Sequence, residues 1–320
     1  MTMGAAIMRA PGSRRSTAFT ALVRGAMLIA GAQTPDAHAH VIAAGSVDTN
    51  ALGWPFEPFV IALLATAAVG YALGYRRLAR QSRRGRTQLM RRAAAFSVGL
   101  ATLFVALCTP LDTLSGVLFS AHMVQHELLM IVAAPLAVLG RPLPTWLWAL
   151  PPSARFRVAR VARTRWLRTS WRAATAPVPA WLLHAAALWI WHIPRCFDAA
   201  LAAPGVHTLQ HASFLGSALL FWRAVFDDAA RPAHGASAAL SLFTTMVHTA
   251  ALGALITLSP GLWYLPYAET TTALGLAPLE DQQLGGLVMW VPAGLAYVAA
   301  ALALVARWLR RPAGLRAEAP

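Results

Sequence analysis

The chain has 320 residues, of which 58% are hydrophobic and only 12% are charged, and its mean hydropathy is +0.53. A soluble domain normally has about a quarter of its residues charged, so this composition excludes an ordinary soluble protein and predicts a bilayer as the solvent. The net charge of +15 does not indicate a nucleic-acid partner, because all 27 basic residues are arginines in short blocks between apolar runs, with no basic stripe interleaved with aromatics.

Residues 1–39 have the pattern of a secretory signal peptide. A basic region comes first, with Arg9, Arg14, Arg15 and Arg24. The short apolar stretch Ala26–Ala32 follows, and Ala37-His38-Ala39 matches a cleavage site. An uncleaved leader is the alternative, because Arg24 interrupts the apolar region. Cleavage would leave residues 40–57 as a short external segment.

Seven apolar runs follow the leader, and each is close to the ~20 residues that cross the hydrocarbon core of a bilayer. They cover 58–75, 93–111, 115–139, 178–194, 206–226, 238–259 and 285–306. We therefore predict an all-α, polytopic membrane protein with seven transmembrane helices over residues 58–308, followed by a tail over 309–320.

Arginines are distributed unevenly over the connections between these runs. Beyond the leader they fall after the first, third and fifth spans and in the C-terminal tail, with the single exception of Arg195. Loops rich in Lys and Arg stay in the cytoplasm. The mature N-terminus is therefore predicted outside the cell and the C-terminus in the cytoplasm.

Residues 155–172 combine seven arginines with aromatic and aliphatic side chains. This segment is either an amphipathic helix on the anionic inner leaflet or a solvated basic loop that only fixes the topology. Two cysteines, Cys108 and Cys196, are both predicted near the outer face. They could form one disulfide, although two unrelated apolar positions explain them better.

Histidines gather near the outer ends of three predicted spans. The third span carries His122 and His126, the fifth opens with His207 and His211, and the fourth ends at His192. The i,i+4 spacing places both imidazoles of a pair on one helix face, one turn apart. A single histidine would most simply bond to a neighbouring helix. Five at a common depth favour a metal or proton role, because ionisable groups inside a membrane are costly.

Copper is the metal that these residue types favour. Imidazole nitrogens, supplemented by thioether sulfurs, suit copper better than calcium or magnesium. Further ligands or supporting groups are sought among His248, Met123, Met246, Met289, Gln125 and Gln210. Each methionine alone is better explained by packing, and the two glutamines would orient the imidazoles. His184 is predicted to be structural.

These residues also carry a resemblance to a known family, the integral-membrane CtaG type of cytochrome c oxidase assembly factor. The resemblance rests on His122-Met-Val-Gln-His126 and on residues 133–142, 188–194, 207–211 and 278–292, and it covers roughly residues 55–310. The chain departs from the family pattern at Glu127, where a leucine is expected. The resemblance implies a seven-span protein of the bacterial plasma membrane that is not an enzyme and that assembles a haem-copper oxidase with the oxidase subunits.

Three functions follow from the two lines of reasoning. The first is an assembly factor that holds or transfers copper at the outer face, receiving it from a copper donor protein. The second is a copper permease, in which His248, Met246 and Met289 continue the path inward. The third is a haem-binding membrane oxidoreductase. The outer segment Pro278–Gln283 is expected either to close over the site or contact a partner, or simply to cap its own helix with Glu280 and Asp281.

Overall fold

The structure, a computed structural model, describes residues 53–55, 57–81, 85–230 and 235–310. The predicted signal peptide, most of the external segment and nearly all of the C-terminal tail lie outside the described residues. Every regular element in the described part is helical. In chain order these are α2 (Pro58–Gln81), α3 (Arg86–Cys108), α4 (Pro110–Ser115), α5 (Phe119–Glu127), the π-helix η2 (Leu128–Ala133), α6 (Ala134–Gly140), α7 (Pro142–Ala149), α8 (Pro152–Ala162), α9 (Arg165–Ala174), α10 (Pro177–Trp191), α11 (Pro194–Ala202), α12 (Pro204–Ala230), α13 (Gly235–Thr257), α14 (Tyr267–Ala273) and α15 (Pro278–Leu309).

Five of the described helices are long and apolar enough to cross a membrane. They are α2, α3, the continuous stretch Phe119–Gly140, α13 and α15. A sixth span results if α9 and α10, which meet at an angle of 66°, are taken together. The helix α12 is 27 residues long and runs through the bundle, but polar residues near both of its ends lower its hydropathy. A multi-pass membrane protein is the architecture that these helices indicate.

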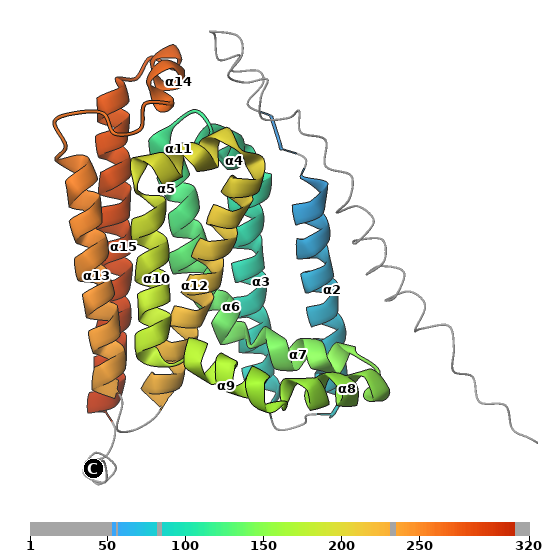
Figure 1. Ribbon diagram of the computed structural model, residues 1–320. Helices are drawn as coiled ribbons and strands as arrows, with labels where there is room; N and C mark the ends of the chain where they lie inside the picture. The colour runs from blue at the N-terminus through green and yellow to red at the C-terminus, as the bar shows by residue number, and fades with distance from the viewer. Residues whose placement is uncertain (1–52, 56, 82–84, 231–234, 311–320) are drawn as a thin grey trace, which may run out of the picture.

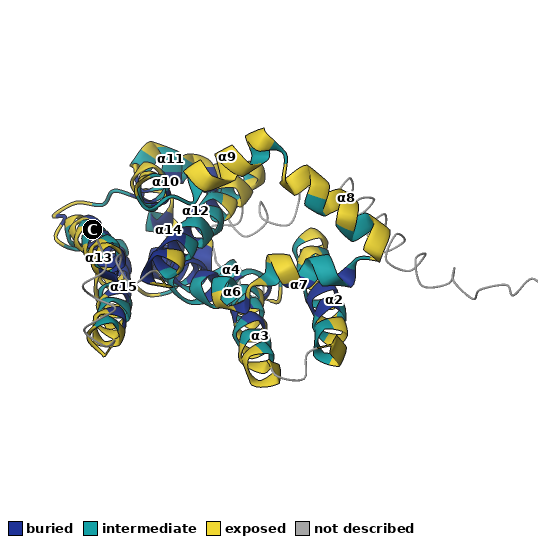
Figure 2. Ribbon diagram, turned by 90° about the horizontal axis from the view of Figure 1, so that it is seen from below, coloured by how far each residue is buried: buried dark blue, intermediate teal, exposed yellow. Residues whose placement is uncertain are grey.

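The long helices run side by side, and short helices cover both ends of the bundle (Figure 1). At one end lie α4, α11 and α14, and across the other end lie α7, α8 and α9. Seen along the bundle, α8 and α9 cross its end from α7 towards α10, and most of their surface is exposed (Figure 2). The chain therefore has three layers: an end cap, a bundle that forms the core, and a second cap rich in arginine.

The third predicted span is interrupted by a change of helix type. Its α-helix widens into a π-helix over Leu128–Ala133 and becomes α-helical again at Ala134. Pro135 explains the change, because proline has no N–H and its ring clashes with the carbonyl four residues before it. One carbonyl in the widened turn, that of Met130, accepts a hydrogen bond of 2.9 Å from the Trp222 indole N–H of α12. The interruption thus joins this span to α12 in the core.

Close backbone contact holds α13 against α15. A Cβ atom added at Gly253 would lie 2.8 Å from the carbonyl oxygen of Gly286, and one added at Gly286 would lie 2.7 Å from that of Gly253. Small residues are what membrane helices use to approach so closely, since apolar burial gives no net attraction between helices in lipid.

The first helix joins the rest of the chain mainly through α7. The Tyr71 hydroxyl donates to the carbonyl of Gly140 at 2.8 Å, and the Trp146 indole N–H donates to that of Ala67 at 3.0 Å. About one turn beyond Tyr71, Gly74 lies so close to α7 that a Cβ atom would overlap the carbonyl oxygen of Thr145.

Replacing Gly74 with alanine should therefore separate α2 from α7. We expect the Gly74→Ala variant to lose about 1–3 kcal/mol of stability, as over-packed sites do, measured by thermal unfolding in detergent. Gly216→Ala is the matched control, because a Cβ atom in that helix meets nothing within 4 Å. It should be neutral or stabilising, since alanine is the better helix former. Equal melting temperatures for the two variants would contradict this account of the contact.

Candidate metal centre

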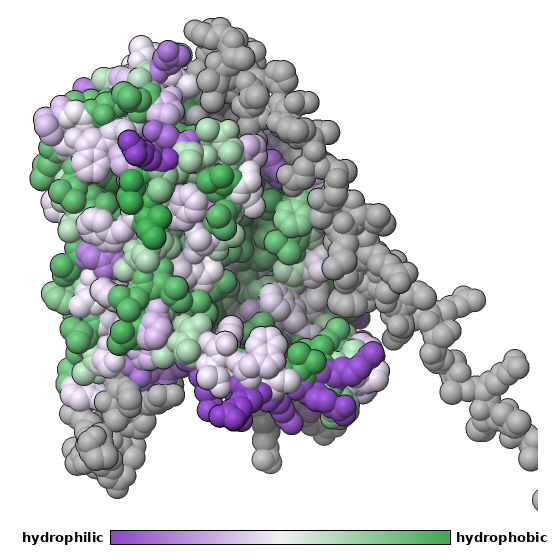
Figure 3. All heavy atoms as spheres, in the orientation of Figure 1, coloured by the Kyte–Doolittle hydropathy of each residue, from purple (hydrophilic) through white to green (hydrophobic). Residues whose placement is uncertain are grey.

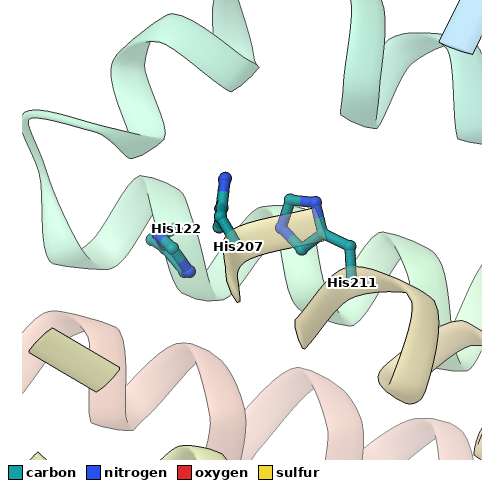
Figure 4. A group of neighbouring side chains, drawn as sticks. All are labelled: His122, His207 and His211. Carbon is teal, nitrogen blue, oxygen red and sulfur yellow. The ribbon is translucent and has the colours of Figure 1, made fainter. Parts of the chain in front are cut away.

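Three of the predicted histidines form one compact group. His122 comes from the first turns of α5, and His207 and His211 come from α12, one turn apart. Their ligand nitrogens all lie within 4.8 Å of one another (Figure 4). A first-row metal ion binds imidazole nitrogen at about 2.0–2.1 Å. Small rotations of these rings would therefore place three nitrogens around one ion.

The other two predicted histidines adjoin this group. The His126 ring lies 4.3 Å from that of His122 and 5.3 Å from that of His211, measured between centroids. His126 and His192 both contact the Phe214 ring, at 4.5 Å and 6.1 Å. Both imidazoles are almost completely buried. The structure thus brings together the five histidines singled out in the sequence, with three as an inner set and two beside them.

Hydrogen bonds determine which nitrogen of His192 is available to a metal. Nδ1 lies 2.6 Å from the carbonyl oxygen of Leu188. A carbonyl only accepts, so Nδ1 carries the proton and Nε2 carries the lone pair. That Nε2 is buried and has no hydrogen-bond partner among the described residues.

His122 has the same arrangement at the other side of the site. Its Nδ1 lies 3.0 Å from the Tyr267 hydroxyl and 3.2 Å from the carbonyl oxygen of Ser115, and that hydroxyl itself donates to the carbonyl at 2.8 Å. Nδ1 must then be the donor, which leaves Nε2 as a buried lone pair without a hydrogen-bond partner in the described part of the chain. Metal-binding histidines have this pattern, with one nitrogen held by an oxygen and the other facing the ion.

Aromatic side chains cover the site at the end that bears α11 and α14. Tyr264 stacks on Phe119 at 4.5 Å, and Phe197 contacts both Tyr264 and the His122 ring, at 4.5 Å and 4.9 Å. Burial, and to a smaller extent the nearby Asp281 carboxylate, raises the pKa of the Tyr267 phenol well above its ordinary value. The phenol therefore remains a donor at any physiological pH.

Asp281 has a role that neither sequence-based explanation of it anticipated. It lies in the first turn of α15, but its carboxylate accepts from the backbone N–H groups of Phe119 at 2.7 Å and Ser120 at 3.2 Å, and from the Ser120 hydroxyl. It thus caps α5, the helix that carries His122, rather than its own helix. A carboxylate there satisfies free N–H groups and complements the helix dipole. No local pattern in the sequence indicates this contact, because Asp281 and Phe119 are 162 residues apart.

The supporting groups predicted from sequence are only partly in place. Gln210 is completely buried and close to His122. Gln125 is directed elsewhere, because its amide donates to the carbonyl of Ala106 at 2.7 Å and to Asp112 at 2.6 Å. It therefore holds α5 against α3 and α4 and does not orient an imidazole.

The remaining candidates pack in the bundle, outside the grouped histidines. Met123 and Met289 belong to an apolar cluster with Leu252 and Ile256, and Met246 packs against the main core. His248 contacts the Trp181 ring at 5.5 Å between centroids. His184 lies within bonding distance of Ser217 and Tyr297, as a structural histidine does. Cys108 and Cys196 are free thiols, so the disulfide alternative is wrong.

Comparison with known proteins assigns the family. The family model described as "Cytochrome c oxidase caa3 assembly factor (Caa3_CtaG)" matches residues 69–311, most of the chain. The chain belongs to this family. That assignment agrees with the resemblance found in the sequence motifs, and an assembly factor points to a non-catalytic role.

The curated relatives come from mycobacteria and are named only as uncharacterized proteins. Proteins of Mycobacterium bovis and Mycobacterium tuberculosis are each 29% identical over 266 residues, and one of Mycobacterium leprae is 25% identical over 267 residues. The alignments cover 81% of this chain but only 40% of each relative. No solved structure matches the chain.

Removing the charge of Asp281 should loosen α5. Asn in its place keeps one acceptor oxygen but loses the second acceptor and the charge, so we expect Asp281→Asn to cost roughly 1–3 kcal/mol of stability. Glu280→Gln removes the same charge from an exposed neighbour in the same turn and should change stability by less than about 0.5 kcal/mol. Chemical denaturation in detergent would measure both. A Glu280→Gln variant as unstable as Asp281→Asn would show that overall charge, and not the cap, matters.

Proposed function

We propose that this protein serves the assembly of a haem-copper cytochrome c oxidase by holding or transferring copper at the outer face of the bacterial plasma membrane. The observation that carries the proposal is the convergence of the His122, His207 and His211 nitrogens within 4.8 Å. Copper is here the cargo of the protein. Its partners would be the oxidase subunits and a protein that supplies the metal.

The chemistry of the donor set favours copper over the hard divalent cations. The inner set consists of imidazoles, whereas calcium and magnesium require oxygen ligands. The fixed proton on Nδ1 of His122 leaves a neutral ligand nitrogen that needs no deprotonation before it binds a metal. Neutral ligands in an apolar setting suit a cation of low charge such as Cu(I), because burying a higher charge without a counter-ion is costly.

The proposal includes a topology of seven spans with the C-terminus in the cytoplasm. We count α12 as a span, because 27 residues extend for about 40 Å and it lies between other spans. The helix α10, from which α9 bends away by 66°, supplies one further crossing. The arginine-rich helices α8 and α9 would then lie at the cytoplasmic surface and the histidines near the outer one.

Loss of one inner histidine should remove copper binding. We expect His122→Gln and His207→Gln each to weaken Cu(I) binding more than about 100-fold, since even the outer-shell partners of metal ligands are worth 10–100-fold. Competition with a coloured Cu(I) chelator would measure the affinity of purified protein. Oxidase activity should also fall in cells that express each variant at the level of the wild type.

His248→Gln is the matched control, because it removes a membrane histidine outside the group. It should bind copper and support the oxidase normally, whereas a copper permease that uses His248 would lose transport into proteoliposomes. Wild-type protein that carries no copper and still supports oxidase assembly would contradict the proposal.

The topology can be tested with a native cysteine. Cys196, at the start of α11, is partly exposed, whereas Cys108 is only 2% exposed. We expect a membrane-impermeant maleimide to label Cys196 from outside intact spheroplasts. In a Cys196→Ala background, Ser170→Cys on α9 should react only after the membrane is permeabilised. The opposite pattern of labelling would reverse the orientation.

A further inference from the structure

Two helices at the end of the bundle opposite the histidines have no buried residues. These are α8 and α9, which lie across that end and, with the turn between them, carry seven arginines from Arg155 to Arg172. In the space-filling view, hydrophilic atoms gather along the lower edge of these helices, and less polar atoms lie above them, towards the bundle (Figure 3). We call α8 and α9 together the basic platform.

The basic platform is fixed to the bundle at both of its ends. Just before α8 begins, Arg77 of α2 donates from Nη1 to three carbonyls at the end of α7, those of Trp148, Ala149 and Leu150, at 2.8–3.0 Å. There the Arg155 guanidinium also lies 4.2 Å from the Trp148 ring. At the α9 end, Arg223 of α12 lies 5.7 Å from the Trp171 ring. These contacts indicate a surface held in a set position, unlike a solvated loop.

Within the platform, α9 separates its basic and apolar side chains. Arg165, Arg168 and Arg172 have the spacing i, i+3, i+7, which places them along one stripe of the helix, and all three are exposed. Leu167, Trp171 and Ala174 have the spacing i, i+4, i+7 and form a different stripe. Such a division is typical of helices that lie in the plane of a membrane surface.

The length of the next helix sets the depth of α9. With 15 residues, α10 extends only about 22 Å, less than the ~30 Å of hydrocarbon in a bilayer. A two-residue turn joins α9 to α10 at an angle of 66°. If α10 crosses the bilayer, its short length would place α9 in the headgroup layer, with the arginine stripe at the level of the lipid phosphates.

We propose that the arginine stripe of α9 is a binding site for anionic phospholipid. Arg165, Arg168 and Arg172 would bind the lipid phosphates, while Leu167 and Trp171 contact the acyl chains. A guanidinium is suited to this task, because its planar fork binds phosphate oxygens in pairs and keeps its charge at all relevant pH values. This inference concerns the opposite end of the molecule from the histidines and does not depend on copper.

The test uses the full-length protein in nanodiscs that contain phosphatidylcholine and a small fraction of brominated phosphatidylglycerol. Bromine quenches the fluorescence of nearby tryptophans. The variant Trp166→Phe/Trp171→Phe lacks both tryptophans of α9, so the difference in quenching between the wild type and this variant measures the quenching of α9. We expect strong quenching of this contribution by the anionic lipid and weak quenching by the same fraction of brominated phosphatidylcholine. Each basic side chain near an anionic surface is worth roughly fivefold in affinity.

The variant Arg165→Gln/Arg168→Gln/Arg172→Gln should therefore reduce the preference for anionic lipid at least tenfold. Arg76→Gln/Arg80→Gln/Arg91→Gln is the matched control, because it removes three exposed arginines from α2 and α3 and leaves α9 intact. It should keep the preference. Equal loss in both triple variants, or equal quenching by the two brominated lipids in the wild type, would overturn the proposal.

Discussion

A polar group inside a bilayer must find its partner within the protein, because no water is present in the hydrocarbon core to replace it. The bundle meets this constraint at several places with hydrogen bonds between neighbouring helices. The Trp222 indole satisfies a carbonyl released by the π-helix, and Gln125 is bonded to Ala106 and Asp112. The Nε2 atoms of His122 and His192 are among the buried polar atoms that have no hydrogen-bond partner in the described residues, while Nδ1 of each ring is held by an oxygen. A metal cation, which accepts electron pairs, could satisfy these lone pairs.

Much of this arrangement is predictable from the sequence, because the bilayer imposes simple lengths and periods. The apolar runs locate α2, α3, α13 and α15, and the i,i+4 spacing correctly places each histidine pair on one face. The common depth of His122, His207 and His211 follows from counting residues inward from the ends of two spans. Whether these histidines converge depends on which helices are neighbours. The structure makes α5 and α12 neighbours, because they pack around shared residues such as Phe214.

What the sequence did not reveal depends on contacts between distant segments. Asp281 and Phe119 are 162 residues apart, and nothing in the local pattern of α15 indicates that its first turn caps another helix. The hydrogen bonds of Gln125 are a similar case, because they depend on Ala106 and Asp112, which belong to other helices. Short helices are also harder to predict than spans: residues 155–172 were expected to be either an amphipathic helix or a loop and form most of α8 and α9, whereas α7 was not predicted. The seven-span count itself remains a proposal, because α12 carries polar side chains that a hydropathy criterion penalises.

The last helix connects the histidine site to the packing of the whole bundle. Asp281 holds the start of α5, and one turn later Gly285 lies so close to Phe119 that a Cβ atom would overlap its ring. Gly286, next in the chain, makes the backbone contact with Gly253 of α13. The position of His122 is therefore set by α15, a helix that contributes no histidine, and the same turn of α15 fixes α13. A helix start determined by the Asp281 carboxylate and by close contact with Gly285 leaves α5 little freedom to shift, which is what a preorganised ligand set requires.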